Sequence, residues 1–262
     1  MHENFTIALG ICAFAAFATL LGSLVLFRAK GENPRLLAFG LAFAGGAMVY
    51  ISLAEILVKA QLSFTAVYDD KTGYALATGA FFCGVLLVAA LDRFLPNPHE
   101  GLDSGKFEEQ TKTHAARIGL MAAIAITAHN IPEGMATFFA ALDDPSIGFP
   151  LAVAIAIHNI PEGVGIAIPV YFATQSKIKA IGACGLSALA EPFGALLGYA
   201  LLGPYLTGAV YGWIFGIIAG VMVFLALDEL LPAAKKYAKG HETVYGMVAG
   251  MGALALSLVL LR

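Results

Sequence analysis

Charged residues are scarce in this sequence. Only 13% of the 262 residues are Asp, Glu, Lys or Arg, whereas soluble domains average about 25%. Hydrophobic residues make up 59% of the chain and the mean hydropathy is +0.81. The net charge of −3 is not the basic excess that a nucleic-acid partner requires. The composition excludes an ordinary soluble domain and predicts an all-α, polytopic membrane helix bundle in contact with lipid.

The spacing of the cysteines gives no sign of disulfide bonds. The three cysteines, Cys12, Cys83 and Cys184, each lie in an apolar run, and none forms a CxxC pair. They are expected to be packing residues. The first apolar run lacks the basic segment and the small-residue cleavage site of a signal peptide, so it is expected to stay in the protein as a membrane span.

Eight apolar runs are long enough to cross a bilayer core, which takes about 20 helical residues. Charged or turn-rich segments such as Asp143–Pro145 separate them, and 95–116 is the one long polar loop. Residues 1–262 are therefore expected to form a single integral membrane domain. The predicted spans are 5–27, 36–58, 73–91, 118–142, 147–172, 180–202, 209–231 and 244–261.

The basic residues predict an orientation. Of the 15 Lys and Arg residues, 12 lie in loops that follow odd-numbered spans, and the even-numbered loops hold Lys59 and Lys71. Because cytoplasmic loops carry the excess of Lys and Arg, the loop 95–116 is expected in the cytoplasm and both termini outside.

Two internal repeats stand out. Residues 46–55 align with 220–229 at a constant offset of 174, with Met-Val-aromatic and a Glu in register. Five predicted spans separate the two segments, so they would cross the membrane in opposite directions, as in inverted repeats with a substrate site near the midplane. The second repeat is stronger, because residues 129–134 and 158–163 are both His-Asn-Ile-Pro-Glu-Gly.

Ionisable side chains deep in a bilayer are costly and mark function by default. The predicted spans place three carboxylates deep in the membrane: Glu133, Glu162 and Glu191. No Lys or Arg lies in the middle of any predicted span, so these carboxylates have no basic side chain to pair with. His129 shares a helix face with Glu133, and His158 with Glu162, because each pair is four residues apart. Imidazole and carboxylate without thiolate suit Zn²⁺, Fe²⁺, Mn²⁺ or Co²⁺.

The neighbouring residues extend this predicted metal site. Asn130 and Asn159 can add amide oxygens, and Glu191, beside Pro192, is a further candidate ligand. The glycines that end both hexapeptides allow backbones to approach closely. Three carboxylates nearer to span ends are candidate secondary or gate residues, although they are equally explained by contact with headgroups or water: Glu55, Asp228 and Glu229.

The duplicated HNIPEG on adjacent helices, the later AEPFG and the eight spans resemble the ZIP family of metal transporters, in its bacterial ZupT-like branch. The resemblance covers nearly the whole chain. It implies a 3+2+3 arrangement, in which spans 1–3 and 6–8 are inverted repeats around spans 4 and 5. It also implies import of divalent metal ions across the bacterial cytoplasmic membrane through a binuclear centre, and not an enzyme.

The resemblance also implies a ligand assignment. The first metal would take His129, Glu133, His158 and Glu162; the second would take Asn130, Asn159 and Glu191, with Glu133 and Glu162 bridging. Relatives often carry histidines in the long loop, where this chain has His99, Glu100 and His114.

The residues leave alternatives open. A channel or facilitator would use the same ligands as a carrier. A di-iron membrane enzyme fits less well, because the ferritin-like motif is Glu-x-x-His and the motif here is His-x-x-x-Glu. The preferred metal, the coupling ion and the choice between monomer and homodimer are not encoded in these patterns.

Overall fold

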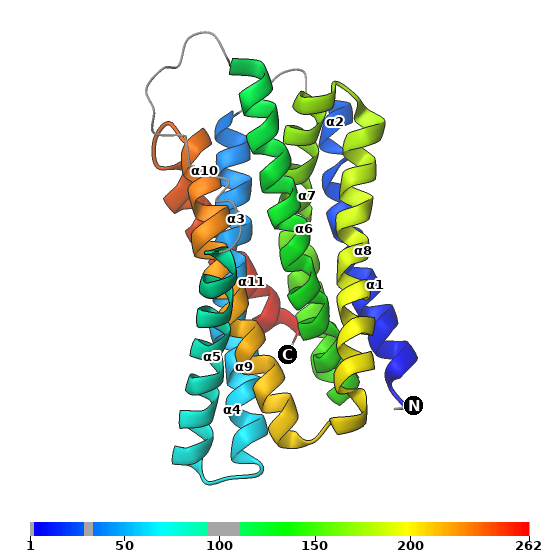
Figure 1. Cartoon of the computed structure of the whole chain (residues 1–262), viewed down its shortest axis with the longest axis vertical. Coiled ribbons are helices and arrows are strands. Elements are labelled where there is room, and N and C mark those ends of the chain that lie inside the picture. The colour runs from blue at the N-terminus through cyan, green and yellow to red at the C-terminus, as the bar shows by residue number, and fades with distance from the viewer. Residues whose placement is uncertain (1–2, 29–33, 94–110, 262) are drawn as a thin grey trace.

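The computed structural model describes residues 3–28, 34–93 and 111–261, and within these ranges the chain is helical and has no β-strand. Figure 1 shows the helices gathered into one bundle. The elements are α1 (Phe5–Gly22), α2 (Val25–Arg28), α3 (Pro34–Ile51), η1 (Ser52–Ile56), α4 (Leu57–Thr65), α5 (Asp70–Asp92), α6 (Thr111–Asp143), α7 (Pro145–Thr174), α8 (Lys177–Leu202), η2 (Gly203–Tyr205), α9 (Gly208–Leu225), η3 (Ala226–Leu230), α10 (Leu231–Tyr237) and α11 (Glu242–Leu261).

Side-chain caps begin the helices that follow the short loops. Asp69 caps α5 by accepting hydrogen bonds from the backbone N–H groups of Lys71 and Thr72, and Asp144 caps α7 by accepting from Ser146. Ser176 and Thr207 do the same for α8 and α9. Because each cap satisfies a backbone donor that the helix leaves free, these residues fix where the chain turns back into the bundle.

The helices agree with a multi-pass membrane protein. Seven of them are long and apolar enough to cross a membrane among the residues searched, and α6, of 33 residues, covers the predicted fourth span. Large apolar side chains such as Leu86, Leu201 and Val259 are exposed on outward faces, as expected for surfaces that lipid covers. The predicted loop 95–116 lies mostly outside the described residues, including His99 and Glu100; its last residues begin α6.

Two of the membrane helices contain a π-helical segment that the sequence analysis did not predict. In the second span η1 joins α3 to α4, and in the seventh η3 joins α9 to α10. The helical path of the second span continues to Thr65, beyond the expected end at residue 58. Lys59, which the charge count assigned to a loop, is therefore buried within a helix. A single π turn accommodates an extra residue in a continuous helix and is frequent at functional sites.

The antiparallel pair α6–α7 lies in the middle of the bundle. It contacts α1 and α8 on one side and α3, α9 and α11 on the other (Figure 1). Outside this pair, α3 packs along α11 and α5 packs along α9. The two hexapeptides therefore lie on central helices, surrounded by the rest of the protein.

Candidate metal centre

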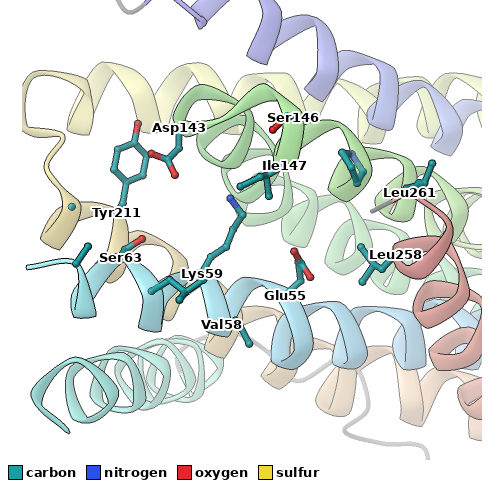
Figure 2. Close-up of a pocket in the computed structure, with 14 residues that line it drawn as sticks. Glu55, Val58, Lys59, Ser63, Asp143, Ser146, Ile147, Tyr211, Leu258 and Leu261 are labelled. Atoms are coloured by element: carbon teal, nitrogen blue, oxygen red, sulfur yellow. The ribbon is translucent and has the colours of Figure 1, made fainter. Parts of the chain in front are cut away.

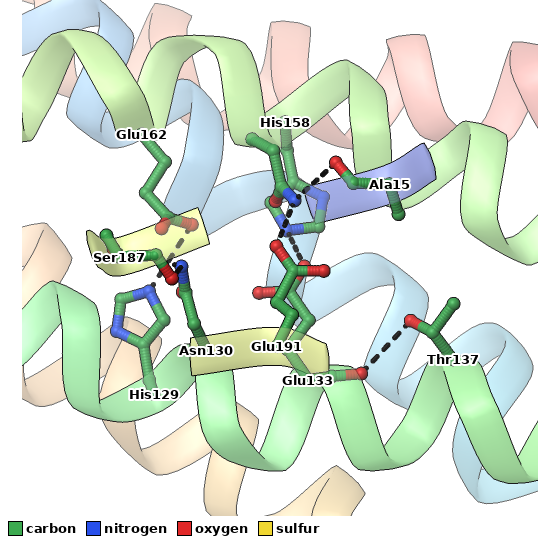
Figure 3. Close-up of polar contacts among 10 residues, drawn as sticks. Ala15, His129, Asn130, Glu133, Thr137, His158, Glu162, Ser187 and Glu191 are labelled. Atoms are coloured by element: carbon green, nitrogen blue, oxygen red, sulfur yellow. Dashed lines mark hydrogen bonds and ion pairs between the residues drawn. The ribbon is translucent and has the colours of Figure 1, made fainter. Parts of the chain in front are cut away.

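The duplicated hexapeptides meet where α6 and α7 face each other. The histidine of each helix points at the glutamate of the other (Figure 3): His158 Nε2 lies 2.8 Å from Glu133 Oε1, and His129 Nε2 lies 3.4 Å from Glu162 Oε2. One ligand atom from each of His129, Glu133 and Glu162 lies within 4.8 Å of the others. The spacing of four residues places each pair on one face, and the antiparallel packing of two identical faces produces the crossed pairing.

Asn130 and Asn159 lie beside this cluster with their amide groups oriented by neighbouring helices. Asn130 Nδ2 donates to the Ser187 carbonyl at 3.3 Å and to Ser187 Oγ at 3.1 Å. Asn159 Nδ2 donates to the Ala15 carbonyl at 3.1 Å and to Glu191 Oε1 at 2.7 Å. Because a carbonyl can only accept, these contacts fix which end of each amide is nitrogen. The amide oxygens are thereby left facing away from Ser187 and Ala15.

The cluster is enclosed, and many of its polar atoms have no hydrogen-bond partner. All seven predicted ligands have a relative exposure of 0%. The unpartnered atoms include Oδ1 of Asn130 and of Asn159, Nδ1 of His129 and of His158, and Oε2 of Glu191. Buried polar groups without partners are rare because each one costs about 1–3 kcal/mol. So many in one place indicate a site built for a ligand that supplies the missing bonds.

Close backbone packing brings Glu191 to the cluster. A Cβ placed on Gly134 would lie 2.5 Å from the Cα of Glu191, and one placed on Gly163 would lie 2.9 Å from the carbonyl carbon of Thr19. The expectation that the hexapeptide glycines allow close approach is thus confirmed. Thr137 Oγ1 donates to the Glu133 carbonyl at 3.0 Å, one turn further along α6.

The structure places the other three candidate carboxylates outside this cluster. Glu55 lies in η1 and lines a separate cavity, while Asp228 and Glu229 lie in η3. Glu55 is buried and the other two are half-buried. The α6–α7 cluster therefore comprises the seven predicted ligands, six of them on α6 and α7 and Glu191 on α8, and none of these three carboxylates.

Sequence reasoning missed the supporting contacts around the ligands. Besides Ser187 and Ala15, the thiols of Cys12 and Cys184 lie 3.6 Å and 3.3 Å from the carbonyl oxygens of Gly134 and Gly163. All three cysteines are free, and Cys12 and Cys184 are buried as expected of packing residues, whereas Cys83 is exposed. These contacts depend on which faces of α1 and α8 meet the central pair, for which the apolar sequences of α1 and α8 carry no clear signal.

Comparison with known proteins identifies the family. The family model described as ZIP Zinc transporter matches residues 96–258. A protein named Zinc transporter ZupT from Stenotrophomonas maltophilia is 60% identical over 262 residues, which cover 99% of this chain and 97% of the relative. Proteins of the same name from Neisseria meningitidis serogroup B and Lysinibacillus sphaericus are 59% and 46% identical, over 98% and 100% of this chain and 97% and 100% of the relatives.

The match extends over more than half of the chain, and the identities hold over nearly its full length. The enzyme alternative falls with it, because the family is one of transporters. This chain belongs to the ZIP zinc transporter family and resembles its ZupT members.

Proposed function

We propose that residues 1–262 form one transporter domain that imports zinc across the bacterial cytoplasmic membrane, and that Fe²⁺, Mn²⁺ and Co²⁺ are also substrates. One observation carries this proposal. Seven fully buried imidazole, carboxylate and amide groups converge between α6, α7 and α8, and many of their donor atoms have no partner. The ZupT relatives, which are named as zinc transporters, support zinc as the principal substrate.

The charge of the cluster supports a cationic substrate. The carboxylates of Glu133 and Glu162 pair with His158 and His129, and Glu191 adds a third buried carboxylate that accepts from Asn159. A carboxylate deep in a membrane costs about 2.5–3.5 kcal/mol or more unless it is neutralised. A divalent metal ion would neutralise two carboxylates at once and coordinate the free donor atoms.

We assign the ligands to two adjacent metal positions. His129, Glu133, His158 and Glu162 form the first, in keeping with the two crossed His–Glu pairs. Asn130, Asn159 and Glu191 form the second, and the two hexapeptide glutamates bridge. Amide and carboxylate oxygens suit Mn²⁺ and Fe²⁺ better than nitrogen-rich sites do, which supports a broad choice of metal.

We further propose that the bundle is a 3+2+3 assembly of inverted repeats around α6 and α7. The π-helical segments support this, because η1 at 52–56 and η3 at 226–230 differ by the same offset of 174 as the sequence repeat. The contacts of α1 and α8 support it as well. Asn159 donates to residue 15 and Asn130 to residue 187, while the thiols of residues 12 and 184 face the two hexapeptide glycines; both differences are 172.

Such an inverted arrangement suits a carrier with alternating access. The full burial of all seven ligands favours a carrier over a channel, because a conducting channel requires a solvated path past its ligands. We place both termini outside, following the positive-inside bias. With this orientation, import means that the metal enters from the side of the two termini and is released on the side of the loop 95–116.

Zinc uptake into proteoliposomes tests this function. Purified protein should give saturable uptake of radioactive zinc, and external Mn²⁺, Fe²⁺ or Co²⁺ should compete. The Glu133→Ala/Glu162→Ala variant should lose uptake while still inserting and eluting as a folded protein, because removing buried carboxylates relieves charge. Lys71→Ala, at an exposed position of α5, serves as the matched control. Full uptake by the double variant would exclude the proposed site.

A further inference from the structure

A cavity with a largely apolar lining and a few charged side chains lies at the end of the central hairpin, where α6 turns into α7. It has a volume of about 780 Å³ and is lined by residues of α4, α9 and α11 together with Asp143, Ser146 and Pro150 of the hairpin. Asp143 and Pro150 lie on the two helices that carry the metal ligands. Asp143 follows Glu133 by ten residues, or about 15 Å along a helix. Under the proposed orientation this is the outer side of the membrane.

Lys59 extends from α4 into this cavity. Figure 2 shows its amine between the carboxylates of Glu55 and Asp143, which line the cavity from η1 and from the end of α6. Only 8% of Lys59 is exposed, and its Nζ lies 5.3 Å from the centre of the Phe215 ring, within the range of a cation–π contact. Glu55, Asp143 and Asp144 all attract it electrostatically.

Asp144, next to Asp143 in the turn between α6 and α7, adds a carboxylate near the cavity that is ionised at neutral pH. Asp144 accepts hydrogen bonds from Ser146 N and Oγ at 2.8 Å and 2.7 Å. These bonds, and to a smaller extent the nearby Lys59 charge, hold the pKa of Asp144 below its usual value. Three acidic side chains, Glu55, Asp143 and Asp144, therefore lie close enough to Lys59 to attract its ammonium.

We propose that Lys59 is a tethered counter-cation whose ammonium occupies the space between Glu55 and Asp143 until an incoming divalent ion displaces it. Lys59 thereby sets the zinc concentration at which uptake begins and selects divalent over monovalent ions. The inference rests on the proposed zinc import. It makes Lys59 a specificity-determining residue that acts before the metal reaches the α6–α7 cluster.

The physical basis is competition between charges. A monovalent ion gains no charge by replacing an ammonium that is already held in place by its own side chain. A divalent ion interacts twice as strongly with the same carboxylates, because the Coulomb energy scales with charge. The ammonium also weakens binding of the divalent ion itself, so that the metal does not remain bound in this cavity. Lys59 therefore raises the KM for zinc and protects the cavity from K⁺ and Na⁺.

The test compares zinc uptake by proteoliposomes that contain wild type, Lys59→Met, Lys59→Gln, Lys59→Arg or Lys71→Met, at constant ionic strength. Lys71→Met is the matched control, since it removes the same charge from an exposed residue at the start of α5 on the same predicted side. Removing the charge of Lys59 should lower the zinc KM about tenfold, and replacing a bulky organic cation by K⁺ or Na⁺ should then inhibit uptake. Lys59→Arg and Lys71→Met should behave as wild type.

Each result decides between specific alternatives. An unchanged or raised KM in both Lys59→Met and Lys59→Gln, with wild-type uptake intact, would overturn the role of Lys59 and leave zinc import standing. An equal shift in Lys71→Met would do the same, because the effect would then come from surface charge in general. Absence of zinc uptake by wild type would overturn the proposed function and this inference with it. A merely structural role of Lys59 would lower the maximal rate without making uptake sensitive to K⁺.

Discussion

Replacing Gly134 by alanine should separate the effect of helix packing from the effect of the ligands themselves. Gly134 directly follows Glu133, and its Cα faces the backbone of Glu191 on α8. A Cβ there would lie 2.5 Å from the Cα of Glu191 and closer still to its carbonyl oxygen. Because both partners are backbone atoms, no side chain can rotate away, and α6 and α8 would have to separate by roughly 1 Å to restore ordinary contact.

The expected cost follows from this geometry. Overpacking of a buried contact costs about 1–3 kcal/mol, which in a chain of this size corresponds to roughly 2–12 °C in melting temperature. The separation would also pull Glu191 away from Asn159, whose amide nitrogen now lies 2.7 Å from Glu191 Oε1. Gly134→Ala should therefore lose both thermal stability and zinc uptake, although it removes no ligand.

Gly182→Ala provides the matched control on α8. A Cβ at Gly182 meets nothing within 4 Å, and alanine is favoured over glycine inside a helix by about 1 kcal/mol. This variant should be as stable as wild type or slightly more stable, with normal uptake. Thermal unfolding in detergent is measured as the loss of the monodisperse peak with rising temperature, and zinc uptake is compared at matched protein amounts. Equal stability and uptake in both variants would refute the packing argument.

Two further predictions concern topology and metal choice. A cysteine introduced at Ser146 should react with a membrane-impermeant reagent from outside, whereas cysteines in 95–116 should react only after the inner face is exposed; the opposite pattern would reverse the proposed orientation. His158→Ala should reduce zinc uptake more than Mn²⁺ or Fe²⁺ uptake, because it removes a nitrogen donor, and Glu191→Ala should do the reverse. Competitive uptake of the three metals measures this, and equal losses for all metals in both variants would show that the two positions act as one unit.

The convergence of the proposed ligands was predictable because local geometry determines much of it. A spacing of four residues places His129 and Glu133 on one face in any helix, and duplication of the motif on consecutive antiparallel helices makes mutual contact the natural outcome. Glu191 was predictable for a different reason: a carboxylate in the middle of an apolar span requires a partner. These arguments need only helical periodicity and the cost of burying charge.

Other features depend on tertiary packing and could not be read from the residues. The orientation of the Asn130 and Asn159 amides is set by carbonyls on α8 and α1, whose rotation about their axes has no strong amphipathic signal in membrane helices. Lys59 was assigned to a loop because a lysine usually ends a membrane span. Its burial depends on Phe215 and on the acidic residues at the α6–α7 turn, which are far away in the sequence. The π-helical segments lack a signal of their own, although the repeat placed them at matching positions.

Anomalous scattering at the zinc absorption edge, from crystals of the wild-type protein grown with zinc, tests the central claim most directly. The account predicts two zinc peaks between α6, α7 and α8, about 3.5–4 Å apart as in other binuclear sites, with Glu133 and Glu162 between them. One peak should lie beside His129 and His158, and the other beside Asn130, Asn159 and Glu191. Zinc peaks elsewhere in the bundle, with none between these helices, would contradict it.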